Sequence, residues 1–519
     1  MSLLKLAAVL SAASVLSVFL SWAWLRILAF ANRRRTRRLH NVAAGATVIG
    51  FFHPFCAGGG GGERVLWRAV LALSSLSKDL GKPLHVLIYT GDLDKSPEDI
   101  LSGVTRQFDL SIDPAALSVS FVYVHGRGLL DPNQYPVFTM LAQSVASMVL
   151  AAEALFRATP DVFFDTTGFA FSFPVAWLAG CSVGAYVHYP TISTDMLSRV
   201  RDQRPSHNNG SWIASSTSVS WAKLLYYHAF AFLYGVAGGF ASNVMVNSTW
   251  TKGHISAMWK RSSPAVVFPP CDTSELETIP IKEPRERCAL SVGQFRPEKD
   301  HAMQVQALAE LRKLSNTRKS SGSDTPNGLH YTSFDDVRLV ILGSCRNDDD
   351  RQVLERTRAL AVELGVEERV EFVVNCSYDE LKGWLGRASV GLHTMWNEHF
   401  GIGVVEMMAA GLVTIAHRSG GPAADIIRPY GIHHGYLAQH PEEYAHYMAQ
   451  VFHEGREGRA AGLINGQSTP YSVRAAAKIA SRRFSNEVFD REFPARFAGL
   501  LQPRSSSVSS RGGGGGKED

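Results

Sequence analysis

Two glutamates separated by a glycine-rich loop form the pattern in this sequence whose residue types are best suited to chemistry. Within WNEHFGIGVVEMMAAGLVTIAHRSGGPAADII (396–427), Glu398 and Glu406 are eight residues apart. The loop between them comprises Phe400, Gly401, Ile402 and Gly403. We expect Glu406 in the first turn of a helix that runs to Ala410 and is ended by Gly411. The N–H groups of the loop and the helix dipole would then favour a sugar and a phosphate bound between the two carboxylates.

A second pattern, SVGQFRPEKDH (291–301), places two cations just after a predicted strand. The strand ends at Gly293, and Arg296 and Lys299 follow it. Arginine offers a planar fork for phosphate oxygens, and lysine offers a compact charge. The pair suits a diphosphate whose charge grows as it leaves, although two basic surface residues are more often simply solvated.

Five consecutive glycines in GFFHPFCAGGGGGER (50–64) join a strand-like run to an amphipathic helix. A dinucleotide fingerprint requires G-x-G-x-x-G, but Gly58 and Gly60 are followed by Glu63 where the third glycine should be. Two interpretations stay open. The run is either a plain tight turn or a side-chain-free loop whose N–H groups meet an anionic ligand at a helix N-terminus.

Composition and charge exclude several classes of protein. The chain has 519 residues, 45% of them hydrophobic and 19% charged, which is typical of a globular protein too long for one core. The five arginines of RRRTRR (33–38) account for the whole net charge of +5, so we expect no nucleic-acid partner. The six cysteines lie far apart without a Cys-x-x-Cys pair, which favours reduced thiols and no zinc site. Asp348, Asp349 and Asp350 lie in a polar stretch and are better interpreted as solvated, so we expect no metal.

Apolar runs typical of buried parallel strands alternate with helix-length segments along most of the chain. The first series of runs covers 46–55, 85–92, 121–126, 161–168 and 184–190. The second series covers 288–295, 337–344, 369–376, 388–394 and 412–418. This alternation predicts an α/β protein with two doubly wound, Rossmann-like domains that face each other across a cleft.

The domain boundaries follow from shifts in composition. We predict an anchor (1–31), a basic juxtamembrane linker (32–45), a first domain (46–266), an interdomain linker (267–287), a second domain (288–480), a C-terminal helix that crosses back (481–502) and a disordered tail (503–519). Residues 315–335 form a polar insertion between a helix and a strand.

The N-terminal segment predicts a single transmembrane helix. Leu6 to Leu25 carry no charge and are long enough to span a bilayer, and the arginines of 33–38 follow at once. By the positive-inside rule the C-terminal side is cytosolic, so the sequons at Asn209 and Asn247 would be accidental. The alternative, a cleaved signal peptide, would place its charge before the apolar run.

Two further segments, 137–156 and 224–240, are unusually apolar for surface helices. They are either buried core helices or a surface that rests on the bilayer. Neither is expected to span, because a second crossing would sever the sheet of its own domain.

The Glu-x7-Glu spacing, the Arg296 and Lys299 pair and the glycine loop together resemble retaining GT-B glycosyltransferases of family 4. The segments FFHPFCAGGGGGERVLW, YVHYPTISTDML and VMVNSTWTKGHI extend the resemblance over residues 40–500. They are similar to the members of that family that lengthen dolichol-linked oligosaccharide at the endoplasmic reticulum.

The resemblance implies a reaction and its partners. GDP-mannose is the donor, and a dolichol-diphosphate oligosaccharide on the cytosolic leaflet receives the fourth and fifth mannoses in α-1,2 linkage. The product retains the anomeric configuration of the donor, and no metal cofactor is needed. Other mannosyltransferases of the endoplasmic reticulum are candidate partners.

The resemblance also implies roles for individual residues. Arg296 and Lys299, beside Gly293, bind the diphosphate, and Glu406 binds the ribose hydroxyls. Glu398 orients the transferred hexose, and His188 in YVHYP lies beside the reacting sugar. The glycines implied to bring the first domain close to donor and acceptor are Gly59 and Gly60.

Rival interpretations come from other classes of protein. An oxidoreductase with two Rossmann domains would need the intact fingerprint and leaves the two glutamates without a role. A non-catalytic membrane scaffold would need neither the cations nor the acids. Within the transferases, another nucleotide sugar or lipid acceptor stays open. So does the choice between same-face attack, which the analogy favours, and a double displacement.

Overall fold

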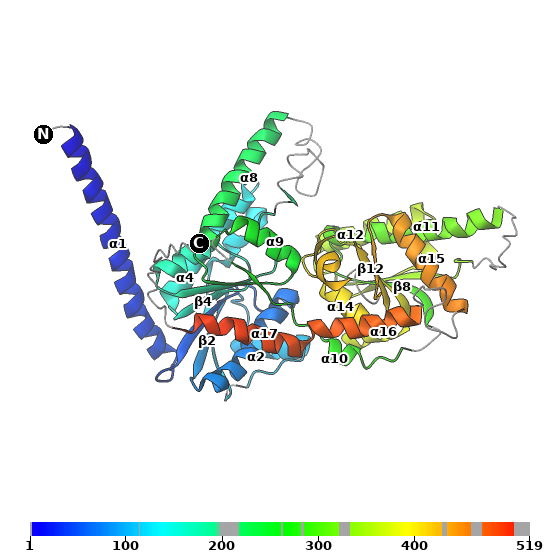
Figure 1. The fold of residues 1–519 in the computed structure, drawn as a ribbon, viewed down its shortest axis with the longest axis horizontal. Helices are drawn as coiled ribbons and strands as arrows, with labels where there is room; N and C mark the ends of the chain where they lie inside the picture. The colour runs from blue at the N-terminus through cyan, green and yellow to red at the C-terminus, as the bar shows by residue number, and fades with distance from the viewer. Residues whose placement is uncertain are drawn as a thin grey trace, which may run out of the picture.

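The structure, a computed structural model of the whole chain, consists of two lobes that lie side by side (Figure 1). It describes residues 3–502 except 114, 194, 197–216, 261–262, 282–284, 321–332, 428–432 and 458–469. The predicted tail, the sequon at Asn209 and most of the polar insertion lie outside the described residues. Each lobe is a parallel sheet with helices on both faces, which confirms the predicted α/β class.

The first lobe contains a seven-stranded parallel sheet in the order β3-β2-β1-β4-β5-β6-β7. Its strands are β1 (Thr47–Phe52), β2 (Leu84–Thr90), β3 (Ser118–Tyr123), β4 (Val162–Asp165), β5 (Ser182–Val187), β6 (Asn243–Val246) and β7 (Ala265–Val266). Its main helices are α1 (Leu3–Leu39), α2 (Gly61–Leu80), α3 (Pro97–Phe108), α4 (Thr139–Arg157), α5 (Ser172–Leu178), α8 (Thr217–Gly238) and α9 (Thr249–Met258). One hydrophobic core lies on the α4, α5 and α8 face of the sheet, and a second lies on the α2 and α3 face.

The second lobe contains a six-stranded parallel sheet in the order β10-β9-β8-β11-β12-β13. Its strands are β8 (Glu286–Val292), β9 (Arg338–Gly343), β10 (Val370–Val374), β11 (Ala388–His393), β12 (Val413–His417) and β13 (Tyr436–Ala438). Its helices are α10 (Thr273–Leu276), α11 (His301–Ser320), α12 (Asp348–Glu363), α13 (Tyr378–Arg387), α14 (Ile402–Ala409), α15 (Pro441–Glu457) and α16 (Pro470–Ser481). Helix α17 (Asn486–Phe497) then returns to the first lobe, where Phe489, Phe493 and Phe497 join the core under α2.

The strand order creates one switch point in each sheet. In the first sheet it lies between β1 and β4, and in the second between β8 and β11, because the chain reverses its direction of winding there. Ligands of such sheets bind outside the carboxyl ends of the strands at this point. The glycine run follows β1, and the segment that carries Glu398 follows β11, so both lie where a ligand is expected.

Every strand predicted from an apolar run is present. The two- and three-residue strands β7 and β13 escaped prediction, and so did β6, which has four residues like the predicted β4. The stretch 267–287 connects the two sheets but is not a plain linker. It contains α10 and the first residues of β8.

Helix α1 runs unbroken from Leu3 to Leu39, so the arginines of 33–38 belong to its last turns and not to a separate linker. They dock it on the first lobe. Arg37 Nη2 lies 2.6 Å from Asp161 Oδ2, and Arg33 Nε donates to the carbonyl of Pro160 at 3.1 Å. Cations in the last turn are also favoured by the helix dipole. These contacts with the first lobe therefore stabilise the helical conformation of the basic segment.

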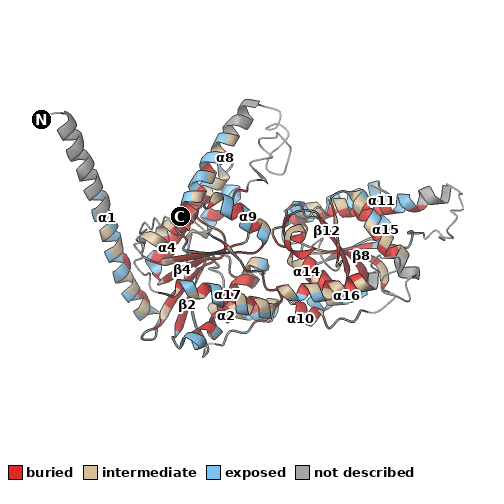
Figure 2. Ribbon diagram, viewed as in Figure 1, coloured by how far each residue is buried: buried red, intermediate tan, exposed pale blue. Residues whose placement is uncertain are grey.

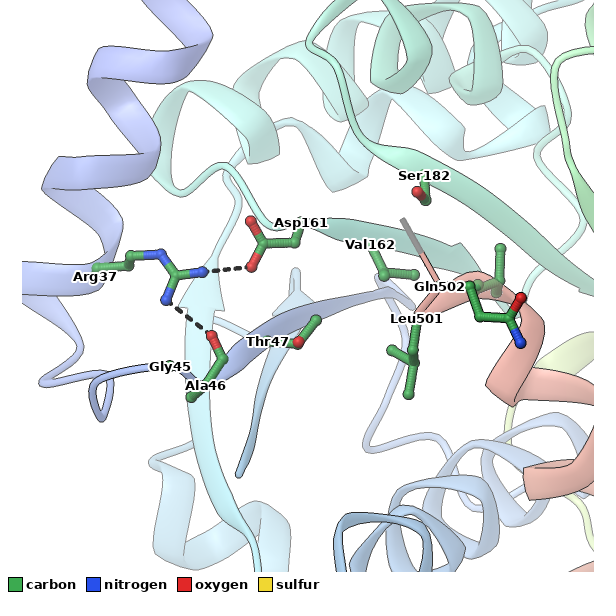
Figure 3. Close-up of a pocket in the computed structure, with 10 residues that line it drawn as sticks. Arg37, Gly45, Ala46, Thr47, Asp161, Val162, Ser182, Leu501 and Gln502 are labelled. Atoms are coloured by element: carbon green, nitrogen blue, oxygen red, sulfur yellow. Dashed lines mark hydrogen bonds and ion pairs between the residues drawn. The ribbon is translucent and has the colours of Figure 1, made fainter. Parts of the chain in front are cut away.

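An open pocket of about 480 Å³ lies at the joint between α1 and the sheet (Figure 3). It lies at the amino ends of β1, β4 and β5 and is also lined by Leu500, Leu501 and Gln502. This is the edge of the sheet opposite to the one where ligands bind. The pocket lies where α1 joins the sheet, and none of the predicted site residues lines it.

The two apolar helices α4 and α8 each bury one side and expose the other (Figure 2). Exposed apolar side chains include Val149 and Phe156 on α4, Leu225 and Phe232 on α8, and Trp24 and Ile27 on α1. Among the residues whose side chains the structure describes, α4 alone is long and apolar enough to cross a membrane, and most of the predicted span 6–25 of α1 lies outside that set. Only 39% of its most apolar window is buried, so α4 is not a fully buried core helix, and its contact with a bilayer stays a prediction.

Candidate active site

At the switch point of the second sheet, Glu398 is paired with two basic side chains. Lys299 Nζ lies 2.7 Å from Glu398 Oε2, and His393 Nε2 lies 3.2 Å from the same oxygen. Burial raises the pKa of Glu398, but the charge of Lys299 and the hydrogen bond from His393 outweigh it and hold the pKa well below its ordinary value. Glu398 is therefore a fixed, ionised acceptor. The stem of Lys299 lies against Gly293, where an added Cβ would be 3.6 Å from Lys299 Cδ.

The backbone of Glu398 is held by the turn that follows β12. The N–H of Gly421 donates to the carbonyl of Glu398 at 2.7 Å, and the N–H of Asn397 donates to Ser419 Oγ at 2.7 Å. Gly420 has a φ of +61°, and a Cβ there would overlap the carbonyl oxygen of Glu398. Only glycine fits this contact, which fixes the height of Glu398 above the sheet.

Glu406 lies in the second turn of α14, not in the first as the sequence predicted. Gly401 caps the helix with a φ of +110°, so α14 begins at Ile402. Glu406 Oε1 lies 3.6 Å from Arg64 Nη1, and Arg64 Nη2 lies 4.0 Å from Asp272 Oδ2. Burial raises the pKa of Glu406 above its ordinary value, the charge of Arg64 opposes that rise, and Asp272 adds to it.

Two other predicted residues of the second lobe are placed less directly. The side chain of Arg296 is 37% exposed and lies 3.7 Å from Glu298, and the carbonyl of Arg296 accepts a hydrogen bond from the N–H of Lys299 at 3.1 Å. The side chain of Phe400 is buried against Phe268 and Phe484. A ligand can therefore meet only the backbone of Phe400, because its ring belongs to the core.

The glycine run lies at the N-terminus of α2, and its members have different tasks. The N–H of Gly60 is already bound to Glu63 Oε2 at 2.8 Å, and Gly59 (φ +79°) is packed against Gln107. A Cβ on Gly61 would lie 3.0 Å from Ile402 Cδ1, and one on Gly62 would lie 3.7 Å from His188 Nε2. The glycines that face the second lobe and His188 are thus Gly61 and Gly62, whereas Gly59 and Gly60 shape the turn.

His188 follows β5 and presents an unused nitrogen to the site. A hydrogen bond with the backbone of Thr166 occupies one side of its ring, and Nε2 is buried with no hydrogen-bond partner among the described residues. Burial lowers the pKa of His188 to about 4, and the nearby His53 adds to this. The ring is therefore neutral at physiological pH. His53 itself donates or accepts at Thr166 Oγ1 (2.8 Å) and lies 3.5 Å from Glu63.

The two lobes meet directly beside Glu398. The ring of His399 stacks on Tyr189 at 4.9 Å, and Ser248 Oγ donates to the carbonyl of His399 at 2.6 Å. Asn397 Nδ2 donates to Asp195 Oδ2 at 2.7 Å. The residues on both sides of Glu398 are thus held by the first lobe, which makes the site a property of both domains.

Sequence reasoning missed several of these residues. His393 closes a predicted strand, and a polar side chain at a strand end was the available signal. Arg64 and Glu63 stand beside the glycine run, but no local pattern links Arg64 to Glu406, which is 342 positions further along the chain.

Among the described residues, no group of three or more His, Cys, Asp or Glu side chains is placed to hold a metal ion. The Asp348–Asp350 cluster begins α12. Asp348 is exposed, and Asp350 pairs with Arg346 at 3.1 Å.

Two Rossmann-like domains with a paired acid and base at the switch point define a GT-B glycosyltransferase. Residues 273–464 match the family described as Glycosyl transferases group 1. A solved structure of sucrose-phosphate synthase from Thermosynechococcus elongatus superposes with a TM-score of 0.56 at 14% identity, covering 88% of this chain and 99% of that one. At this identity the likeness concerns the fold alone.

Residues 46–259 match the family described as ALG11 mannosyltransferase N-terminus. A protein of Mus musculus is 44% identical over 461 residues, which are 88% of this chain and 87% of that protein. A protein of Homo sapiens is 43% identical over 453 residues, which are 86% of this chain and 85% of that protein. Both are named GDP-Man:Man(3)GlcNAc(2)-PP-Dol alpha-1,2-mannosyltransferase. The chain belongs to this family of mannosyltransferases.

Proposed function

We propose that this chain transfers mannose from GDP-mannose, with retention, to a dolichol-diphosphate oligosaccharide in α-1,2 linkage. The observation that carries the proposal is the 44% identity to a relative of that name across both domains. The acceptor in the relative's name carries three mannoses, so the residues added are the fourth and, by the family resemblance, the fifth.

The geometry supports a role for each group around the donor. Lys299 has three N–H donors, so it can hold Glu398 and a diphosphate oxygen together. By the family resemblance Arg296 also binds the diphosphate, and the first N–H groups of α14 add to the positive field. Glu406 accepts the ribose hydroxyls, and Glu398, held ionised, accepts hydroxyls of the mannose.

These groups stabilise the charge that develops on GDP as it leaves, and such preorganised groups are usually the largest electrostatic contribution to catalysis. We propose that they suffice without a metal ion. We also propose same-face attack by the acceptor hydroxyl, because Glu398 is engaged by Lys299 and His393 and is not free to act as a nucleophile. Neutral His188, with Nε2 unoccupied, is suited to accept a hydrogen bond from the sugar.

The membrane partner is the cytosolic face of the endoplasmic reticulum. The charge asymmetry around α1 supports this orientation, and the exposed apolar side chains of α4 and α8 support a surface that rests on the bilayer. Helix α1 contacts α4 and α5, and α5 contacts α8, so these helices form one connected layer of the first lobe. A lipid-linked acceptor would thereby be presented close to the cleft.

The test incubates detergent-purified full-length protein with a panel of nucleotide sugars and lipid-linked oligosaccharides. The expected product gains one and then two hexoses from GDP-mannose alone, and an α-1,2-specific mannosidase removes them. Turnover should persist in EDTA. A product formed from a UDP-sugar would refute the donor, β-linked mannose would refute retention, and loss of turnover in EDTA that added Mg²⁺ restores would refute metal independence.

A further inference from the structure

Arg64 reaches from the first lobe into the nucleotide side of the second. It lies in the first turns of α2, 3.6 Å from Glu406 and 4.0 Å from Asp272, and its side chain is 17% exposed. Both distances exceed the range of a hydrogen bond, so Arg64 acts on these two carboxylates through its charge. The contact is made possible by Gly61, which brings the start of α2 against Ile402 at the start of α14.

The ionised form of Glu406 is disfavoured by its burial and by the charge of Asp272 in the segment before α10, and both raise the pKa of Glu406. The neutral side chains of Cys271 and Tyr378 also lie near it. The charge of Arg64 opposes the rise in the pKa of Glu406. A carboxylate accepts hydrogen bonds about twice as strongly as a neutral group, so the charge state of Glu406 decides how well it binds a diol.

We propose that Arg64 is the counter-charge of Glu406 and completes the nucleotide site from the opposite domain, as a positioning residue for binding of a nucleoside diphosphate. The inference rests on the proposed function, because it takes Glu406 as the acceptor for the ribose hydroxyls. It has a further consequence. Since the counter-charge belongs to the first lobe, nucleotide affinity depends on the two lobes being together, and by linkage the bound nucleotide holds them together.

The experiment measures GDP and UDP binding by calorimetry between pH 5.5 and 8.5, using detergent-purified full-length protein. Arg64→Gln should weaken binding of the preferred nucleotide about tenfold or more near pH 6 and recover toward wild type at pH 8.5. The sign follows from Glu406: without Arg64 its pKa rises further, so its charge is lost at a higher pH as the solution is acidified. Arg64→Lys should keep most of the affinity.

Two comparisons separate this role from a loss of structure. Arg68→Gln is the matched control, because Arg68 lies one turn further along α2 and pairs with Asp490 of α17, away from Glu406. It should bind nucleotide as wild type does. In a Glu406→Gln background, Arg64→Gln should have little further effect, because the group on which it acts is gone.

A pH-independent loss in Arg64→Gln, an equal loss in the Glu406→Gln background, or unchanged affinity would each overturn the proposal. If Arg64→Gln does not purify in folded form, Arg64→Lys decides, and a tenfold loss in that folded, charged variant refutes the role. A preference of the wild type for UDP over GDP would refute the proposed donor but not Arg64, because both nucleotides carry the same ribose diphosphate.

Discussion

At the scale of single residues, the charge of Lys299 interacts with two groups in the proposed reaction. It holds Glu398 at 2.7 Å and, in the proposed reaction, also stabilises the departing diphosphate. His393 supports this arrangement, because it lies 3.2 Å from the same carboxylate oxygen and helps to keep Glu398 in place. Lys299 and His393 therefore fix the position of Glu398 together.

Lys299→Ala should lower kcat by about 10²–10³, the usual cost of a preorganised electrostatic group. It should also change the pH profile. Lys299 helps hold the pKa of Glu398 well below its ordinary value, so without it Glu398 protonates at a higher pH and activity falls earlier on acidification. A pH–rate profile from 5 to 8 measures this, with Lys313→Ala, an exposed lysine on α11, as the control.

Arg296→Ala should lower kcat at saturating donor too, and unchanged turnover would remove Arg296 from the site.

The two glutamates should fail differently. Glu398→Gln should chiefly lower kcat, because an error of about 1 Å in placing the reacting sugar costs on the order of 10²-fold. It should leave GDP affinity intact, since GDP carries no mannose. Glu406→Gln should weaken GDP binding and raise KM more than it lowers kcat, because ribose does not react. Calorimetry with GDP, alongside steady-state rates, tests this, and equally weak GDP binding by both variants would refute the division of labour.

At the scale of elements, the turn after β12 decides where Glu398 stands. Gly420 and Gly421 lie against the backbone of Glu398, and Gly421 donates to its carbonyl. The loop before α14 is therefore not free to adjust by itself. The turn after β12, the neighbouring strand of the sheet, fixes the position of this loop.

Gly420→Ala should lower kcat by about 10² or more, because a Cβ there must displace Glu398 and the φ of +61° disfavours any residue but glycine. GDP affinity should change much less, because Glu406 lies in the following helix. Gly383→Ala on α13, where a Cβ meets open space, serves as the control and should behave as wild type. Wild-type turnover of Gly420→Ala would show that the contact does not position Glu398.

At the scale of the whole molecule, the apolar surface and the chemistry occupy different parts of the first lobe. The exposed side chains of α4 and α8 belong to the helices over one face of the sheet, and the cleft lies at the carboxyl ends of its strands. This arrangement allows the protein to rest on a bilayer while its cleft stays accessible to a soluble donor.

The orientation can be tested with glycosylation tags. A tag with a sequon after Asp519 should remain unmodified in microsomes, whereas the same tag, about 20 residues long, before Met1 should be glycosylated. The native sequon at Asn247 is uninformative, because Asn247 is 4% exposed and accepts a hydrogen bond from Thr251 at 2.7 Å. A glycan on the C-terminal tag, removable by an endoglycosidase, would reverse the proposed orientation.

Local sequence determined the elements of this protein and the identity of its acids and bases. Parallel strands are buried on both faces, so each appears as an apolar run, and the order of such runs predicted two doubly wound domains. Glu398, Glu406 and Lys299 were predicted as site residues because they flank strand ends and glycine loops. Strands β7 and β13 escaped prediction because two or three residues carry too little periodicity, whereas β6 was missed although β4, of equal length, was predicted.

Only the tertiary structure decided which of these groups act together. Three sets of contacts join residues of different elements. Arg64 pairs with Glu406, and Gly420 lies against the backbone of Glu398. Gly61 and Gly62, not Gly59 and Gly60, face the second lobe and His188. Helix α14 also begins one turn earlier relative to Glu406 than predicted. Its start depends on the left-handed backbone of Gly401. Sequence patterns report the period of a strand or helix, whereas these contacts depend on how two sheets and their loops are packed against each other.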